Sequence, residues 1–190
     1  MVKYIPILEL PLLIIMVLIR NIMLRRHGIK AIMFGATDKT DYLIIPVVLL
    51  FFYGLLSIII KLPFPNILIK PFFEEGFLYI VSIFICTAGL IWFAFTLKVF
   101  GKSFRVGIDE NTKDELIKTG TFAISRNPLY VGFIAFFTGL FLAYLNILIL
   151  LFLIFFAIII HRQILREELF LMSHYKNEYE EYCKKVRRYI

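Results

Sequence analysis

Long apolar runs alternate with short polar stretches along this chain of 190 residues. A membrane-spanning helix needs about 20 mostly apolar residues. Windows of about that size cover residues 5–19, 43–60 and 77–97, and a longer run covers 129–160 with a break at "AYLNIL" around Asn146. The pattern therefore predicts five transmembrane helices, of which the last two form a tight hairpin.

The first window differs from the others because it contains a carboxyl group, that of Glu9. Ionisable groups are costly inside a bilayer, so we expect this helix to be tilted or packed against its neighbours. No short apolar core with a small-residue cleavage site follows the start of the chain. We therefore expect the first helix to be kept rather than cleaved as a signal peptide.

The polar residues gather in two blocks, 98–130 and 161–190, at the two ends of the hairpin run. Both ends of a hairpin lie on the same side of a membrane, so we expect the two blocks to lie together. Turn residues in the first block predict a structured loop with one short helix near Glu115 to Lys118. In the second block, apolar residues recur every three or four positions. This spacing predicts a helix that leaves the membrane, followed by an amphipathic helix along its surface.

Composition supports a membrane class, since 61% of residues are hydrophobic, 18% are charged and the mean hydropathy is +0.85. These values exclude an ordinary soluble domain. We expect an all-α integral membrane protein with one domain over 1–190. Three spans would fill 1–97, and the functional half would fill 98–190.

Basic residues are distributed unevenly around the predicted spans. Five Lys and Arg residues fall in 20–41, six in 98–128 and seven in 161–190, against three elsewhere. Basic loops stay on the cytoplasmic side, so we predict an outside amino terminus and a cytoplasmic carboxyl terminus. The net charge of +7 reflects this asymmetry and attraction to anionic lipid, and it gives no support to a nucleic-acid partner.

Cysteine and histidine indicate neither a disulfide nor a metal site. Cys86 lies within the third predicted span and Cys183 in the cytoplasmic tail, too far apart to be bridged. His27, His161 and His174 are scattered and show no metal-ligand spacing.

The stretch "SRNPLY" raises two alternatives at the start of the fourth span. Asn127 is a good N-cap and Pro128 suits the first helical position, so the stretch can simply begin a helix. Alternatively, the helix N-terminus and Arg126 attract an anion, while Glu167 and Glu168 at the end of the adjoining span attract a cation. A cofactor with a carboxylate, an amino group and a cationic sulfur suits such a site, although chemistry alone does not single it out.

The simpler alternative extends to the second polar block. The tail tyrosines can form an interfacial aromatic belt. Glu167 and Glu168 can balance Arg162 and Arg166 at helical spacing.

Two motifs in order make the second half of the chain resemble the isoprenylcysteine carboxyl methyltransferase family of integral membrane enzymes. In that family Arg-His-Pro-x-Tyr or Arg-Asn-Pro-x-Tyr precedes a helical hairpin, as "RNPLY" does here. A Glu-Glu pair then precedes an aromatic-Gly-x-x-Tyr-x-x-Tyr tail that ends in Val-x-Arg, matched by "EELFLMSHYKNEYEEYCKKVRR". The chain departs from the enzymes with the best-defined substrate at Asn127, where they have His, and from the usual family Gly at Lys176.

The resemblance implies S-adenosylmethionine bound at the cytoplasmic membrane surface and a lipophilic acceptor that enters from the bilayer. The most favoured acceptor is the carboxylate of an isoprenylcysteine-like amphiphile. Arg162 or Arg166 would hold that carboxylate, and with Glu167 they are the candidate catalytic residues. The implied cofactor-binding residues are Leu116, Gly120, Arg126, Asn127, Pro128, Tyr130, Glu168, Tyr179 and Tyr182.

Other functions remain open on the sequence. A phospholipid N-methyltransferase would share the cofactor site but must also remove a proton from an ammonium. A membrane reductase of the sterol reductase type would bind NADPH instead. A lipid-binding or scaffold protein would use "SRNPLY" only as a helix start.

Overall fold

The computed structural model describes residues 4–26, 44–73, 76–100 and 116–190, and the regular secondary structure in these ranges is helical. Five apolar helices lie where five were predicted: α1 (Ile5–Arg26), α2 (Ile44–Ile60), α4 (Gly76–Phe100), α5 (Pro128–Tyr144) and α6 (Ile147–Tyr175). By length and composition α1, α4 and α6 can cross a membrane, while α2 and α5 are shorter. The prediction of an all-α integral membrane protein is confirmed.

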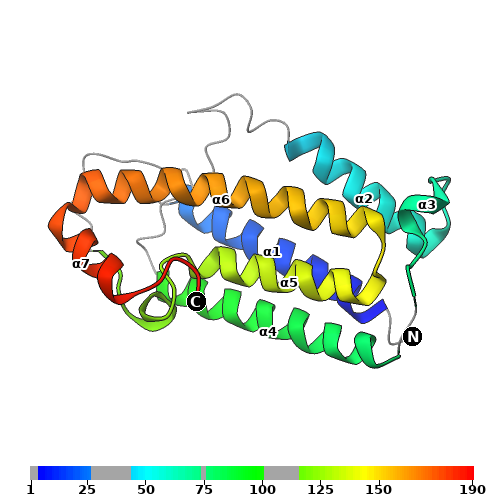
Figure 1. Cartoon of the computed structure of the whole chain (residues 1–190), viewed down its shortest axis with the longest axis horizontal. Coiled ribbons are helices and arrows are strands. Elements are labelled where there is room, and N and C mark those ends of the chain that lie inside the picture. Colours follow the sequence, from blue (N-terminus) through cyan, green and yellow to red (C-terminus); the bar gives the residue numbers. More distant parts are fainter. Residues whose placement is uncertain (1–3, 27–43, 74–75, 101–115) are drawn as a thin grey trace.

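Successive apolar helices run in alternating directions (Figure 1). The α5–α6 turn lies at one end of the bundle beside the short helix α3 (Asn66–Ile69). The opposite end holds the start of α5, the far end of α6 and the last helix, α7 (Asn177–Lys185) (Figure 1). The second end is therefore where the two polar blocks meet, as predicted.

The hairpin between α5 and α6 turns at the predicted break. Leu145 ends α5 in the left-handed conformation, with φ of 40°. Asn146 begins α6 as its N-cap, and its side-chain oxygen accepts a hydrogen bond from Ile149 N at 2.9 Å. Its amide also donates to Ile69 O at 3.3 Å. This buried side chain therefore fixes both the turn and its contact with α3.

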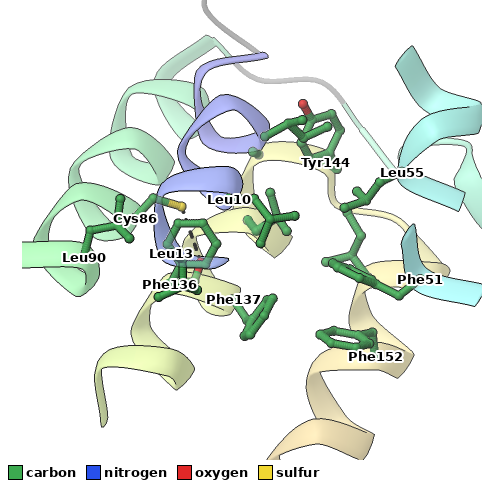
Figure 2. Close-up of a cluster of buried hydrophobic side chains, with 14 of the residues drawn as sticks. Leu10, Leu13, Phe51, Leu55, Cys86, Leu90, Phe136, Phe137, Tyr144 and Phe152 are labelled. Atoms are coloured by element: carbon green, nitrogen blue, oxygen red, sulfur yellow. Dashed lines mark hydrogen bonds between the residues drawn. The ribbon is translucent and has the colours of Figure 1, made fainter. Parts of the chain in front are cut away.

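The α4 and α5 helices pack closely because small residues lie between them. A Cβ added at Gly139 would meet Cys86 N at 2.8 Å and Cys86 Sγ at 2.6 Å, and one added at Gly89 would meet Phe136 N at 2.9 Å. The Cys86 thiol donates to Phe136 O at 3.3 Å, as the dashed line in Figure 2 marks. Close backbone approach through small residues is a typical way for membrane helices to associate.

Aromatic rings join α2 to the hairpin helices (Figure 2). Phe51 of α2 stacks on Phe152 of α6 with ring centroids 3.8 Å apart. Phe137 of α5 meets Phe152 edge-on at 5.1 Å. The apolar core thus lies where α2, α5 and α6 converge, and Leu10 and Leu13 of α1 also contribute to it (Figure 2).

One oxygen of the Glu9 carboxyl is hydrogen-bonded across the contact between α1 and α4, while Oε2 is buried without a partner among the described residues. The Thr87 hydroxyl donates to Glu9 Oε1 at 2.8 Å. The expectation that the first helix packs against a neighbour is therefore confirmed.

Helix α6 is longer than a membrane span needs. Its 29 residues cover about 43 Å at 1.5 Å per residue, against a hydrocarbon thickness of about 30 Å. The last turns of α6 therefore extend beyond the apolar run and carry Glu167 and Glu168. A turn at Lys176, with φ of 48°, leads into α7. The predicted pair of tail helices is confirmed.

The prediction of a short helix near Glu115 to Lys118 is wrong for 116–118, which carry no regular structure; Glu115 lies outside the described residues. A 3₁₀ helix, η4 (Gly120–Ala123), follows instead. Four residues with helical preference cannot nucleate a helix unless packing supports them. The chain instead turns at Gly120, where φ is +61° and an added Cβ would meet Val99 Cγ2 at 2.7 Å. Much of the first polar block, 101–115, lies outside the described residues.

Candidate functional site

Glu168 is the centre of a polar cluster at the start of α5. Its side chain is only 12% exposed. Glu168 Oε1 accepts from Asn127 Nδ2 at 3.2 Å and lies 3.3 Å from a terminal nitrogen of Arg126. Two residues of "SRNPLY" and one of the Glu-Glu pair, predicted to act together, therefore touch although about 40 positions separate them.

Arg188 supplies the strongest contacts of this cluster. Its Nε lies 3.1 Å and 3.0 Å from the two carboxylate oxygens of Glu168, and a terminal nitrogen lies 2.8 Å from Oε2. These hydrogen bonds raise the pKa of the Arg188 guanidinium above its ordinary value, so it stays charged. Sequence reasoning did not single out Arg188. The available signal was the family ending Val-x-Arg, which falls on residues 186–188.

The backbone of the last residues also reaches the start of α5. We call residues 186–190 the C-terminal strap. Arg126 N donates to Arg187 O at 2.9 Å, and the Ser125 hydroxyl and Asn127 Nδ2 each reach Arg188 O at 3.2 Å. Tyr189 of the strap hydrogen-bonds through its hydroxyl to His161 Nδ1. The strap therefore joins the beginning of α5 to α6 at His161.

Asn127 holds the N-cap position of α5 but does not cap the helix with its side chain. Its amide nitrogen donates to Glu168 and to Arg188 O instead. Its backbone N–H donates to the buried Ser125 hydroxyl at 3.1 Å. The interpretation of Asn127 as an N-cap is thus right in position, whereas its side chain belongs to the polar cluster.

Tyr179 and Tyr182 turn inward from α7, and both are buried. The Tyr182 hydroxyl donates to Phe122 O at 2.6 Å, which joins α7 to η4. Burial raises the pKa of Tyr182 to about 12 and also raises that of Tyr179, so both phenols are neutral near pH 7. Two predicted cofactor residues therefore form an aromatic wall at this end of the bundle.

Three buried polar atoms of this region, Arg126 Nε, Thr121 Oγ1 and the Tyr179 hydroxyl oxygen, have no hydrogen-bond partner among the described residues. Buried donors and acceptors are nearly always paired in native proteins, so such atoms need an explanation. A bound polar ligand is one.

Glu167 belongs to a second polar cluster on another flank of α6. Its Oε1 accepts from the Tyr130 hydroxyl at 2.7 Å and from Gln163 Nε2 at 2.9 Å. Gln163 was not predicted, although it stands four positions before Glu167 and so shares its helix face. A candidate catalytic carboxylate is thus held by one predicted residue and one unpredicted residue.

The remaining predicted residues differ in what they contact. The Pro128 carbonyl accepts from Trp92 Nε1 at 2.8 Å, which fixes the start of α5 against α4. Gly120 is needed for its backbone conformation and for its close approach to Val99. Leu116 is partly buried.

Arg162 and Arg166 lie on the outward face of α6. Each is two positions from the fully buried Ile164, which puts it about 160° around the helix from that residue. Arg162 is exposed and Arg166 is partly exposed. Their assignment to the acceptor carboxylate stays a prediction.

Comparison with protein-family models finds the phospholipid methyltransferase model over residues 76–178, more than half of the chain. No curated protein and no solved structure matches. The matched region runs from α4 to the first turn of α7 and contains the "RNPLY" motif and the Glu-Glu pair. The membrane methyltransferase class expected from the resemblance is therefore confirmed: this chain belongs to the phospholipid methyltransferase family, whose members are related to the isoprenylcysteine carboxyl methyltransferases.

Proposed function

We propose that this membrane methyltransferase transfers a methyl group from S-adenosylmethionine to a lipophilic acceptor at the end of the bundle where α5 begins. The observation that carries the proposal is the contact of Arg126 and Asn127 with Glu168. These residues come from the two motifs that bracket the hairpin, and Arg126 and Glu168 lie close enough to the buried Tyr179 of α7 to interact with it electrostatically.

The polar cluster fits the amino-acid part of the methyl donor. Arg126, Glu168 and Arg188 are in contact, and their formal charges sum to +1. The unpartnered Nε–H of Arg126 offers a donor to a carboxylate, and charge-assisted bonds of this kind are strong. The donor carries such a carboxylate. Tyr179 and Tyr182 can cover its adenine or its sulfonium, because cations bind to aromatic faces.

The bound donor supplies an electrophilic methyl group, and the protein must position an acceptor in line with it. The acceptor favoured by the resemblance is the carboxylate of an isoprenylcysteine-like amphiphile. An ionised carboxylate is already a nucleophile, so this transfer needs positioning and electrostatics rather than a base. Arg162 and Arg166 on the outward face of α6 are the proposed contacts for an acceptor that arrives from the bilayer.

A second candidate, N-methylation of a phospholipid amine, is favoured by Glu167 and by the family match. An ammonium must lose a proton before its nitrogen can form the new N–C bond while the methyl–sulfur bond breaks. Glu167, held by Tyr130 and Gln163, can attract the ammonium and accept that proton. The same carboxylate would repel a carboxylate acceptor.

The proposal is tested by equilibrium binding of S-adenosylmethionine to detergent-purified protein, with NADPH as competitor. Saturable binding that is lost in Arg126→Ala and Glu168→Ala supports the methyltransferase site. A folded protein that binds only NADPH would point to a reductase. Binding of neither ligand would favour a lipid-binding or scaffold role and would overturn the proposal.

The acceptor is then identified from the stability of the transferred methyl group. The protein is given methyl-labelled donor together with either an isoprenylcysteine analogue or vesicles of an aminophospholipid. Methylation of the first acceptor would give a methyl ester, and methylation of the second would give an N-methylated amine. Base releases label from an ester and leaves an N-methyl group intact. Glu167→Gln should strongly lower amine methylation, whereas it should not lower ester formation and should raise it if the carboxylate repels the acceptor, which separates the two candidates.

A further inference from the structure

The Glu168 carboxylate is shared unequally by two arginines. Arg188 approaches it with a fork, through three contacts of 2.8 to 3.1 Å. Arg126 reaches Glu168 Oε1 through one terminal nitrogen at 3.3 Å. The residue from the predicted motif is therefore the weaker partner, although its side chain is only 12% exposed.

This inequality leaves part of Arg126 available. Arg126 Nε is buried and has no partner among the described residues. A guanidinium beside a carboxylate ordinarily forms two parallel hydrogen bonds. Arg126 does not do so here because Glu168 already accepts four hydrogen bonds, three from Arg188 and one from Asn127.

Charge acts in the same direction as geometry. The pair of Arg126 and Glu168 alone would be neutral, and Arg188 brings the three residues to +1. A partly desolvated site with a net positive charge attracts an anion more strongly than a neutral one. Arg188 thus favours anion binding in two ways. It adds a positive charge to the site, and it prevents Arg126 from forming a two-bond pair with Glu168.

We propose that Arg188 is a positioning residue for the methyl donor. Arg188 occupies hydrogen-bond acceptor positions of Glu168 and thereby keeps the Arg126 guanidinium available to the carboxylate of the donor. The inference rests on the proposed function, because it concerns the same site. It adds that the strap sets the preference for a ligand with an amino-acid carboxylate, without a direct contact between Arg188 and that ligand.

The test compares two probes that differ in that carboxylate. S-Adenosylhomocysteine carries the amino-acid group, whereas 5′-methylthioadenosine has the same nucleoside and thioether without it. Equilibrium binding of both is measured on detergent-purified Arg188→Ala and wild-type protein. We expect Arg188→Ala to lose about tenfold or more in affinity for S-adenosylhomocysteine and to bind 5′-methylthioadenosine as the wild type does.

Arg187→Ala is the matched control, since it removes an equal charge from the neighbouring exposed side chain and keeps the backbone carbonyl that accepts from Arg126 N. It should bind both probes normally. If Arg188→Ala does not fold, Arg188→Lys carries the same comparison. Lysine keeps the charge but cannot form the fork, so a smaller loss confined to S-adenosylhomocysteine is expected.

Two results would overturn the inference while the proposed function stands: unchanged affinity of the Arg188 variants for S-adenosylhomocysteine, or an equal loss for both probes, as a general structural defect would give. A folded wild-type protein that binds neither probe would overturn the proposed function itself, and the role of Arg188 with it.

Discussion

Asn127 shows how one residue can serve a helix and a site at the same time. It stands at the N-cap of α5, yet its side chain donates to Glu168 and to the strap. We therefore expect Asn127→Ala to weaken donor binding by about tenfold, the range for a lost hydrogen bond to a charged group. Equilibrium binding of S-adenosylhomocysteine measures the effect.

Asn127→Ser provides the control for that prediction. Serine is a good N-cap residue, but its side chain is too short to reach both Glu168 and Arg188 O as the amide does. It should therefore weaken binding as much as alanine does. Restored binding in Asn127→Ser would mean that capping, and not the polar cluster, explains the residue.

Tyr182 gives a prediction about stability at the same scale. Its buried hydroxyl donates to Phe122 O at 2.6 Å, so Tyr182→Phe removes a hydrogen bond and leaves a buried carbonyl without that donor. The free energy of unfolding should fall by about 1 to 2 kcal/mol. A thermal unfolding scan in detergent measures the shift, and a midpoint equal to that of the wild type would contradict this account of the α7 contact.

At the scale of elements, the packing of α4 on α5 depends on positions without a side chain. A Cβ at Gly139 would meet backbone atoms, Cys86 N at 2.8 Å and Ser82 O at 2.9 Å, and backbone cannot move aside as a flexible side chain can. Gly139→Ala should therefore lower stability by about 1 to 3 kcal/mol, as overpacking does. The unfolding midpoint in detergent is again the measurement.

Gly76→Ala is the matched control because nothing lies within 4 Å of an added Cβ there. It also stands at the start of α4, so both substitutions change a helical glycine. Equal effects of the two variants would show that backbone preference, and not helix contact, governs Gly139.

Hydrophobic length predicted the apolar elements well because each must bury enough surface in lipid. It also found the turn at Asn146, where a polar residue interrupts an apolar run. It failed at 116–118, where tertiary contacts determine the local conformation. It also gave no signal for Arg188, because the position of that side chain depends on the strap folding back on Glu168. The pair of Glu167 and Gln163 was within reach of helical spacing, whereas their contact with Tyr130 depends on how α5 meets α6.

At the scale of the whole molecule, the two ends of the bundle differ in polarity. The end that carries the Glu168 cluster also carries most of the Lys and Arg residues of the described chain, and the α3 end carries Lys61 and Lys70. Because basic segments are retained in the cytoplasm, the site end should face the cytoplasm. Because the helices alternate in direction (Figure 1), we then expect the start of α1 to lie on the outside.

Cysteine labelling in intact cells tests this orientation with two exposed positions, Lys70 and Lys184. Cys86 is buried and can stay, while Cys183 is partly exposed and is replaced by serine in both variants. A membrane-impermeant maleimide should label Lys70→Cys in intact cells and Lys184→Cys only after the membrane is opened. The reverse pattern would put the Glu168 cluster outside the cell, away from the cytoplasmic supply of methyl donor, and would contradict the orientation on which the proposed reaction depends.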